Sequence, residues 1–462
     1  MKHENARFTT FSKGTKRVSS ILGPILLGSV LVLLTVLLLL ALPAGDINAQ
    51  SEITAHVVIQ FDDGTLWVRT IQSTDPISGA HALAKTNLEF EQMGELVCSI
   101  EGIGCPASDC FCPDNLWTQS LWDGSGWQQP WPFPNLQDGD VWSFAYNAGW
   151  PPDVAPATPL VAVADGLAWL ATQQSADDGG YGTANESVES LFAVAANGYA
   201  ASEWQREPDS PSLGGHVLSN GATFANSTAA ASGKLAAGLV AGASCWPLNA
   251  TRPMSYYQAS TGAYSSTNDS GAAPHAWGML GTIALSDTVP NDAIQYLKDM
   301  QQANGGWEWG IGWGTDTNAT AMAIQALIVS GEPTSSGVIQ DALDYLQSTQ
   351  NTTDAGFPYN PDGGWPGAEN SDTNSTAYAV QAIVAAGEDP TAAPWVMNNT
   401  NPISFLLSMQ LGDGSFEWQP GLGASQIATQ QAIPALLGRS IPLEVGELDR
   451  CWVQWLPVIL EQ

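Results

Sequence analysis

Blocks of small apolar residues at helical spacing recur through the second half of the chain, and a break of glycine and an aromatic residue precedes most of them. In the unit Gln301–Leu327, one helix ends at Gln301-Gln302 and a Gly–Trp loop follows. Asp316-Thr317-Asn318 then offers side-chain oxygens to the free N–H groups of the next helix. The unit recurs as Leu346–Ile383, so the pattern predicts a repeat architecture.

Six breaks, each followed by a helix, are predicted. The breaks are Gly179-Gly180-Tyr181, Ala222-Thr223-Phe224, Gly262-Ala263-Tyr264, Gly305-Gly306-Trp307, Gly363-Gly364-Trp365 and Gly414-Ser415-Phe416. The helices are Glu186–Asn197, Ser227–Ala241, Pro274–Leu285, Ala319–Val329, Ser375–Ala386 and Gln426–Leu437. Their alanine and glycine suit an inner ring, because small side chains let six helices crowd around one axis. Preceding helices such as Ala293–Gln302 and Ala342–Gln350 would form the outer ring. We therefore predict an all-α (α/α)6 toroid over residues 160–440.

Residues 51–147 instead show the alternation of strands, which predicts a small β-rich domain. His56–Phe61 and Leu66–Ile71 flank a turn as a hairpin, Ser78–Lys85 is a short helix, and a second turn leads into the strand Val141–Phe144. A proline-rich linker over residues 148–159 separates this domain from the toroid. Residues 441–462 form a tail whose apolar segment, Cys451–Leu460, is too short to span a membrane.

The N-terminal 49 residues predict export. Five Lys and Arg residues precede the uncharged run Ile21–Pro43, which is long enough to span a bilayer. A cleavage site after Ala49 would instead make the run a signal peptide, so a secreted form and a membrane-anchored form stay open. In either form the rest of the protein faces the outside of the cell.

Charge and cysteine content agree with an extracellular location. Residues 1–49 hold five of the 13 basic and two of the 45 acidic residues, so the exported part carries a formal charge of −35. A chain this acidic does not bind phosphate backbones by counterion release, which excludes nucleic acid. The cluster Cys98, Cys105, Cys110 and Cys112 lacks the spacing of zinc knuckles, and an oxidising compartment favours two local disulfides. Three pairings are open, and Cys245–Cys451 is a further candidate.

The breaks also carry a family resemblance. Tyr296–Trp307 (YLKDMQQANGGW), Phe405–Phe416 (FLLSMQLGDGSF) and Trp169–Tyr181 (WLATQQSADDGGY) resemble the QW repeats of squalene–hopene-type terpene cyclases and prenyltransferase toroids. In those repeats the glutamine bonds to the start of the next helix and the aromatic residue stacks on it. The resemblance therefore implies that Gln301, Gln410, Trp307 and Phe416 brace the ring. It implies the fold more strongly than the function, because one toroid serves several functions.

The cyclase resemblance also marks a missing acid. Class II terpene cyclases protonate an alkene with the central acid of a DxDDTA motif, and Asp316–Ala321 and Asp372–Ala377 align with that motif. Asn318 and Asn374 stand at the position of the acid. An amide cannot supply that proton, so we expect no cyclase activity by this mechanism.

Other chemistry has less support in the sequence. Cys245, His216 and His275 stand at no ligand spacing, so we expect no prenyltransferase zinc site and no required cofactor. If the chain is an enzyme, Asp316 and Asp372 are the candidate catalytic residues. They could act as the carboxylate pair of a glycoside hydrolase, and Glu308 is an alternative to Asp372 in that pair.

Residues 51–147 resemble the small β domain of the intrinsic factor and transcobalamin family. Its strand pair, short helix, tryptophan-bearing segment with Trp122 and Trp127, and Asp-Gly-Asp turn before a strand occur in the same order here. In that family cobalamin lies between toroid and β domain and undergoes no reaction. The resemblance implies a corrinoid or another bulky amphipathic ligand, held at a toroid mouth that faces the β domain.

We predict one binding mouth, in the loops before the inner helices, because aromatic walls with a few polar groups are typical of small-molecule pockets. Its candidate residues, with two tryptophans of the β domain, are Trp309, Trp313, Asp316, Asn318, Tyr359, Trp365, Asp372, Asn374, Trp418, Trp122 and Trp127. Helix capping by the Asp-Thr-Asn triplets and loop packing by the tryptophans are the structural alternatives. A non-catalytic binding protein is favoured over a diverged terpene cyclase-like or glycan-active enzyme and over a surface interaction protein.

Overall fold

The computed structural model describes residues 52–112, 116–149, 153–265, 271–446 and 448. The described residues belong to one compact unit. No helix within the described ranges combines the length and apolar character that crossing a bilayer requires. The predicted anchor at residues 21–43 and the apolar segment Cys451–Leu460 lie outside the described residues.

The β-rich region carries a five-stranded sheet in the order β2-β1-β8-β6-β7. Its strands are β1 (Ile53–Gln60), β2 (Leu66–Ser73), β6 (Trp117–Trp122), β7 (Trp127–Gln128) and β8 (Val141–Tyr146). The predicted hairpin is confirmed, since β1 pairs antiparallel with β2, and β1 also pairs in parallel with β8. The predicted short helix is a 3-10 helix, η1 (Gly79–Lys85). Gly79 is required there, because an added Cβ would lie 2.3 Å from the Trp142 ring.

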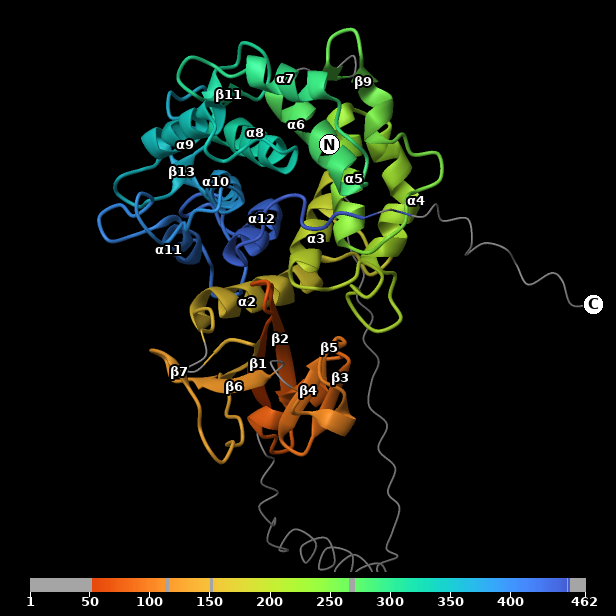
Figure 1. Cartoon of the computed structure of the whole chain (residues 1–462), viewed down its shortest axis with the longest axis vertical. Helices are drawn as coiled ribbons and strands as arrows, with labels where there is room; N and C mark the ends of the chain where they lie inside the picture. The colour runs from red at the N-terminus through yellow and green to blue at the C-terminus, as the bar shows by residue number, and fades with distance from the viewer. Residues whose placement is uncertain (1–51, 113–115, 150–152, 266–270, 447, 449–462) are drawn as a thin grey trace, which may run out of the picture. The chain divides into compact units, whose positions relative to one another are not determined.

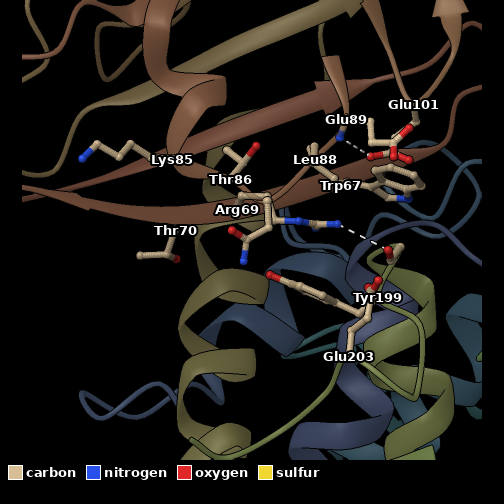
Figure 2. A pocket seen from close by; sticks show the side chains of 12 residues that line it. Trp67, Arg69, Thr70, Lys85, Thr86, Leu88, Glu89, Glu101, Tyr199 and Glu203 are labelled. Atoms are coloured by element: carbon tan, nitrogen blue, oxygen red, sulfur yellow. Dashed lines mark hydrogen bonds between the residues drawn. The ribbon is translucent and has the colours of Figure 1, made fainter. Parts of the chain in front are cut away.

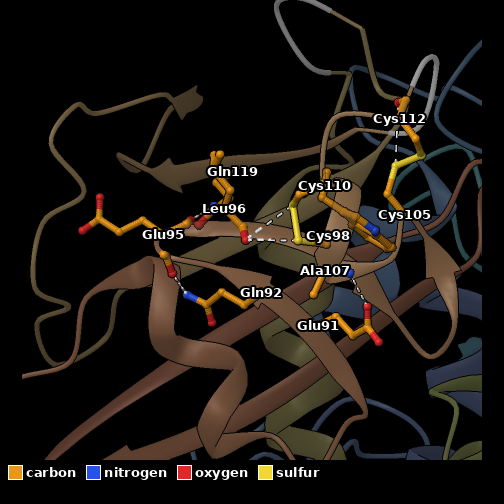
Figure 3. Close-up of a disulfide and its surroundings, with 12 residues drawn as sticks. Glu91, Gln92, Glu95, Leu96, Cys98, Cys105, Ala107, Cys110, Cys112 and Gln119 are labelled. Atoms are coloured by element: carbon orange, nitrogen blue, oxygen red, sulfur yellow. Dashed lines mark hydrogen bonds between the residues drawn. A yellow bond between two sulfur atoms is a disulfide. The ribbon is translucent and has the colours of Figure 1, made fainter.

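A second, three-stranded sheet carries the cysteine cluster. It consists of β3 (Phe90–Met93), β4 (Leu96–Ile100) and β5 (Ile103–Gly104), followed by the 3-10 helix η2 (Ala107–Asp109). Cys98 pairs with Cys110 and Cys105 with Cys112, so the prediction of two local disulfides is confirmed (Figure 3). Each closes a short loop, which stabilises a region with a small core. Cys451 lies outside the described residues, so the Cys245–Cys451 pair stays a prediction.

The second half of the described chain is a helical toroid. The inner helices are α3 (Ala184–Ala196), α5 (Ala229–Ala241), α6 (Ala272–Ala284), α8 (Thr317–Val329), α10 (Thr373–Ala385) and α12 (Gln426–Leu436). Each inner helix packs on the next, and α12 packs on α3, so the ring closes (Figure 1). The outer helices are α2 (Ala157–Gln173), α4 (Leu213–Ala225), α7 (Asn291–Asp299), α9 (Gly337–Thr349) and α11 (Pro402–Ser408).

Among the described residues, short two-stranded ribbons precede three of the six inner helices. They are β9 (Tyr257–Gln258) with β10 (Ala263–Tyr264), β11 (Trp307–Glu308) with β12 (Thr315–Asp316), and β13 (Phe357–Pro358) with β14 (Ser371–Asp372). The prediction of six full helix pairs is wrong at one place. Among the described residues between α5 and α6, the outer position holds only the 3-10 helix η3 (Pro253–Tyr256).

Glutamine and aromatic side chains fasten the ring as the sequence predicts. The Gln301 amide donates to the backbone oxygens of Gly305 and Val338, and thereby ties its own turn to the next outer helix. Gln410 does the same with Gly414 and with Ala162 of α2, which joins the last repeat to the first. Trp307 and Phe416 are fully buried beside these turns. The bracing bonds of the two glutamines are thus confirmed, whereas stacking of the two aromatic rings on them stays a prediction.

Two predicted breaks are wrong. Phe224 lies inside α4, so Ala222-Thr223-Phe224 is helix rather than turn. In the fifth repeat, Phe357 instead of Trp365 occupies the aromatic position. Its N–H donates to the Thr376 hydroxyl at 2.9 Å, as that of Trp307 does to Thr320 at 3.0 Å, whereas the Trp365 side chain is 46% exposed. Gly363-Gly364 resembles the repeat in composition but lies in the loop between β13 and β14.

Candidate functional site

A cavity of about 440 Å³ opens at the N-terminal ends of the inner helices. Apart from Ala231, the third residue of α5, the wall residues from the inner helices share one register, because they occupy the second and sixth positions of their helices, four residues apart on one face. The second positions that line it are Asn185, Ala230, Asn318, Asn374 and Ile427, and the sixth positions are Glu189, Lys234, Trp277, Tyr378 and Gln431. All wall residues from the inner helices lie within the first six positions of their helices. We call this cavity, at one end of the ring, the lumen site.

A polar network forms the floor of the lumen site. Lys234 Nζ donates to Glu189 Oε1 and, at 2.9 Å, to Asn185 Oδ1. Glu189 Oε1 also accepts from Gln431 Nε2 at 2.7 Å, and Gln431 Oε1 accepts from Asn374 Nδ2 at 2.6 Å. Both charged side chains are buried, with Glu189 only 4% exposed. The two charges therefore compensate each other inside the cavity.

Asn318 is the group of the lumen site whose bonding is incomplete. Its side chain lines the cavity and is 9% exposed, yet its Oδ1 accepts no hydrogen bond. A buried acceptor without a partner costs about 1–3 kcal/mol, so such an atom is normally satisfied by water or by a ligand. The second position of α8 therefore carries a cavity-lining amide whose buried oxygen has no hydrogen-bond partner among the described protein groups.

Asp316 and Asp372 are capping residues rather than cavity residues. Asp316 Oδ1 accepts from Ala319 N and its Oδ2 from Trp309 N, at 2.7 and 2.8 Å, while Asp372 accepts from the backbone and the hydroxyl of Ser375. Burial raises the pKa of Asp316 to about 7 and that of Asp372 to about 6, because desolvation outweighs these bonds. Neither carboxylate lines the lumen site, so neither is placed to protonate a ligand there.

The other predicted residues are dispersed. Trp309 joins Asn318 and Asn374 in the lumen site, but Trp313 is 71% exposed at the tip of its loop. Tyr359 and Trp365 stack on each other, with ring centroids 4.5 Å apart. The remaining three do not line it either: Trp418 packs on the core of the ring, and Trp122 and Trp127 pack against each other in the β-rich region.

Glu308, another carboxylate considered from the sequence, braces the loop instead of facing the cavity. It accepts from the N–H groups of Gly312 and Gly314, and Glu417 does the same for Gly421 and Gly423 two repeats later. Among the described residues, no cluster of three or more His, Cys, Asp and Glu side chains is arranged to hold a metal ion.

Glu189, Lys234, Tyr378 and Gln431 were missed by the sequence reasoning. The usable signal was a glutamate and a lysine inside helices expected to form an inner ring, where an unpaired charge is costly. Both residues occupy the sixth position only when they are counted from the observed helix starts, Ala184 and Ala229. The prediction weighed loop tryptophans above these helix residues.

The β-rich region meets the ring elsewhere. Val68 and Asn197, the C-cap residue of α3, exchange two hydrogen bonds, and Arg439, just after α12, donates to Thr65. These contacts lie at the C-terminal ends of inner helices, whereas the lumen site lies at their N-terminal ends. The predicted mouth therefore does not face the β-rich region, and that part of the prediction is wrong.

A second cavity, of about 510 Å³, lies at this contact (Figure 2). Arg69 reaches across it from β2, stacks 4.0 Å above the Tyr199 ring and donates to the Asn197 backbone oxygen at 2.8 Å. Carbonyl groups at a helix C-terminus attract a cation, so Arg69 is explained as a fastening between the two regions.

The fold and the site define a terpene cyclase-like helical toroid. Residues 260–424 match the family model of the squalene-hopene cyclase C-terminal domain. A comparison with curated protein sequences gives no match. The transcobalamin-like resemblance of residues 51–147 stays a prediction.

Solved structures with a similar arrangement include terpene cyclases. Type II terpene cyclase MstE from Scytonema, in its apo form, has 12% identity and a TM-score of 0.41, and covers 61% of this chain and 98% of its own. An Asp-to-Ala variant of MstE bound to its product, merosterolic acid A, has 14% identity and a TM-score of 0.40 over 61% and 96%. A protein from Actinoplanes has 13% identity and a TM-score of 0.37 over 60% and 98%.

Proposed function

We propose that this chain is an exported, non-catalytic binding protein that holds a small molecule in the lumen site. The observation that carries the proposal is the pair of amides, Asn318 and Asn374, that line the cavity where the sequence alignment places the cyclase acid. The carboxylate nearby, Glu189, is paired with Lys234, and Asp316 and Asp372 are engaged as caps. Protonation of an alkene requires an acid that is free to give up its proton, and the site offers none.

The size of the lumen site favours a compact ligand. A volume of about 440 Å³ lies near the lower end of the roughly 300–1,000 Å³ that is typical of small-molecule pockets. A corrinoid, as predicted from the sequence, is larger than a drug-sized ligand and would extend out of the mouth. A corrinoid is therefore one of the compounds to be tested, but it is not the preferred ligand.

A second candidate is a terpene cyclase-like enzyme. The match of residues 260–424 to the squalene-hopene cyclase C-terminal domain favours it. In that case an acid outside the DxDD-like positions would have to act, and the lumen would accept an isoprenoid chain.

One titration separates the two candidates. The purified full-length protein is mixed with corrinoids, isoprenoid alcohols and neutral glycans, and tryptophan fluorescence is followed, since Trp277 and Trp309 line the site. We expect at least one class to change the fluorescence saturably, with no product detected by mass spectrometry after prolonged incubation. Conversion of any panel member to a product would overturn the non-catalytic proposal.

A further inference from the structure

The lumen site is locally neutral, and its wall sets a few amide and charged groups among a larger area of apolar surface. Of the described residues that line it, Glu189 and Lys234 are the charged ones, and they pair with each other. A charged ligand would leave its own charge unmatched in a partly desolvated cavity, which is costly. A hydrocarbon chain would match the apolar part of the wall but would give the amides of Asn185, Asn318 and Asn374 no hydrogen bond. A neutral ligand with both apolar and polar groups therefore fits the wall better than either class.

The hydrogen-bonding pattern asks for a ligand that donates. Asn318 Oδ1 is a buried acceptor without a partner, so the group that satisfies it must carry an O–H or N–H. Hydroxyl groups both donate and accept hydrogen bonds. They therefore suit a wall of amides whose hydrogen-bonding capacity is only partly filled by protein groups.

Aromatic side chains complete the wall. Trp309 and Phe224 line the cavity, and the Trp277 ring lies beneath Lys234, whose Nζ is 5.4 Å from the ring centroid. A flat face of C–H groups packs well on an aromatic ring, while a rim of hydroxyls reaches the amides. Sugar rings combine these two features.

We propose that the ligand of the lumen site is a neutral, polyhydroxylated ring compound, either a free sugar or the terminal unit of a glycan. This inference rests on the binding function proposed above and names its ligand class. The Asn318 amide is the specificity-determining group, and Trp309 provides the packing surface.

The test uses calorimetric titration of the full-length protein with methyl glycosides and short neutral oligosaccharides. An amino sugar, a uronic acid and farnesol serve as cationic, anionic and hydrocarbon probes. We expect the neutral sugars to bind, with equal affinity for a glycoside and its oligosaccharide if only a terminal unit enters. If the oligosaccharide binds more tightly, the protein also contacts sugar units outside the cavity, and the ligand class stays the same.

Variants locate the interaction. Asn318→Ala should weaken sugar binding roughly 3- to 10-fold, because one hydrogen bond to a buried acceptor is lost. Trp309→Ala should weaken it roughly 10-fold through lost apolar contact. The controls are Asn291→Ala, at the exposed start of α7, and Trp313→Ala, on an exposed loop tip; both should bind as the wild type does. Asn318→Asp keeps the shape but adds a charge, so it should shift preference toward the amino sugar.

The possible outcomes distinguish the sugar inference from the proposed binding function on which it rests. Saturable binding of farnesol, reduced by Trp309→Ala, with no sugar binding at tens of millimolar, would overturn the sugar inference and leave the binding function intact. Sugar binding that Asn318→Ala and Trp309→Ala leave unchanged would also overturn it, because the ligand would lie elsewhere. Turnover of any probe would overturn the non-catalytic function itself.

Discussion

The buried ion pair in the lumen makes the most direct prediction about stability. Lys234→Met keeps most of the side-chain length but leaves the Glu189 carboxylate without its cation in a site where Glu189 is 4% exposed. Breaking a buried pair by removing one partner typically costs about 3–5 kcal/mol. Gln431 and Tyr378 still contact Glu189 Oε1, and the cavity is open at its mouth, so we expect the lower end, about 3 kcal/mol.

A double variant tests whether the unpaired charge causes the loss of stability. Glu189→Gln alone leaves the ammonium unpaired and should cost a similar amount. Combined with Lys234→Met, it removes both charges while an amide remains to meet Gln431 and Tyr378, so the double variant should lie within about 1 kcal/mol of the wild type. Urea unfolding followed by the helical circular dichroism signal reports mainly on the ring, where the long helices lie.

A second ion pair provides the control. Lys298 and Glu332 form a 2.9 Å pair whose lysine side chain is 30% exposed, so Lys298→Met should cost at most about 1 kcal/mol. If Lys234→Met costs no more than this control, or if the double variant loses the sum of the two single losses, the lumen pair is not desolvated as described and the reasoning is refuted.

Three further perturbations test the ring and its caps. Gln410→Ala removes the bonds that join the last repeat to α2 and should lower the free energy of unfolding by about 1–3 kcal/mol, whereas Gln302→Ala, at an exposed site, should be nearly neutral. Trp307→Ala should cost about 3–5 kcal/mol and Trp313→Ala less than about 0.5, as measured by urea midpoints. Because burial raises the pKa of Asp316 to about 7, the folded state binds more protons than the unfolded chain; this contribution is complete below about pH 4 and is lost as the pH rises to 7. The free energy of unfolding of the wild type should therefore fall over this range relative to that of Asp316→Asn, and an identical pH dependence for the two proteins would contradict the assignment.

Local sequence determined most of the helical ring. The inner helices begin within about two residues of their predicted starts, because small-residue periodicity and the Asp, Ser and Thr caps are encoded locally. The bracing by Gln301 and Gln410 also followed from the repeat, since each glutamine bonds to backbone groups at fixed offsets. The hairpin of β1 and β2 was readable from its turn.

Tertiary structure decided which side chains meet. Whether a residue faces the lumen depends on the rotation of its helix about the ring axis, and loop composition does not encode that rotation. Trp309, Asn318 and Asn374 were found from their loop and motif, but Glu189 and Lys234, 45 positions apart, are joined only by the packing of the neighbouring inner helices α3 and α5. Trp313 and Trp365 carry the same local signal as Trp309 and yet point to solvent. The choice among the three disulfide pairings likewise depended on how β4 and the following loop fold in space.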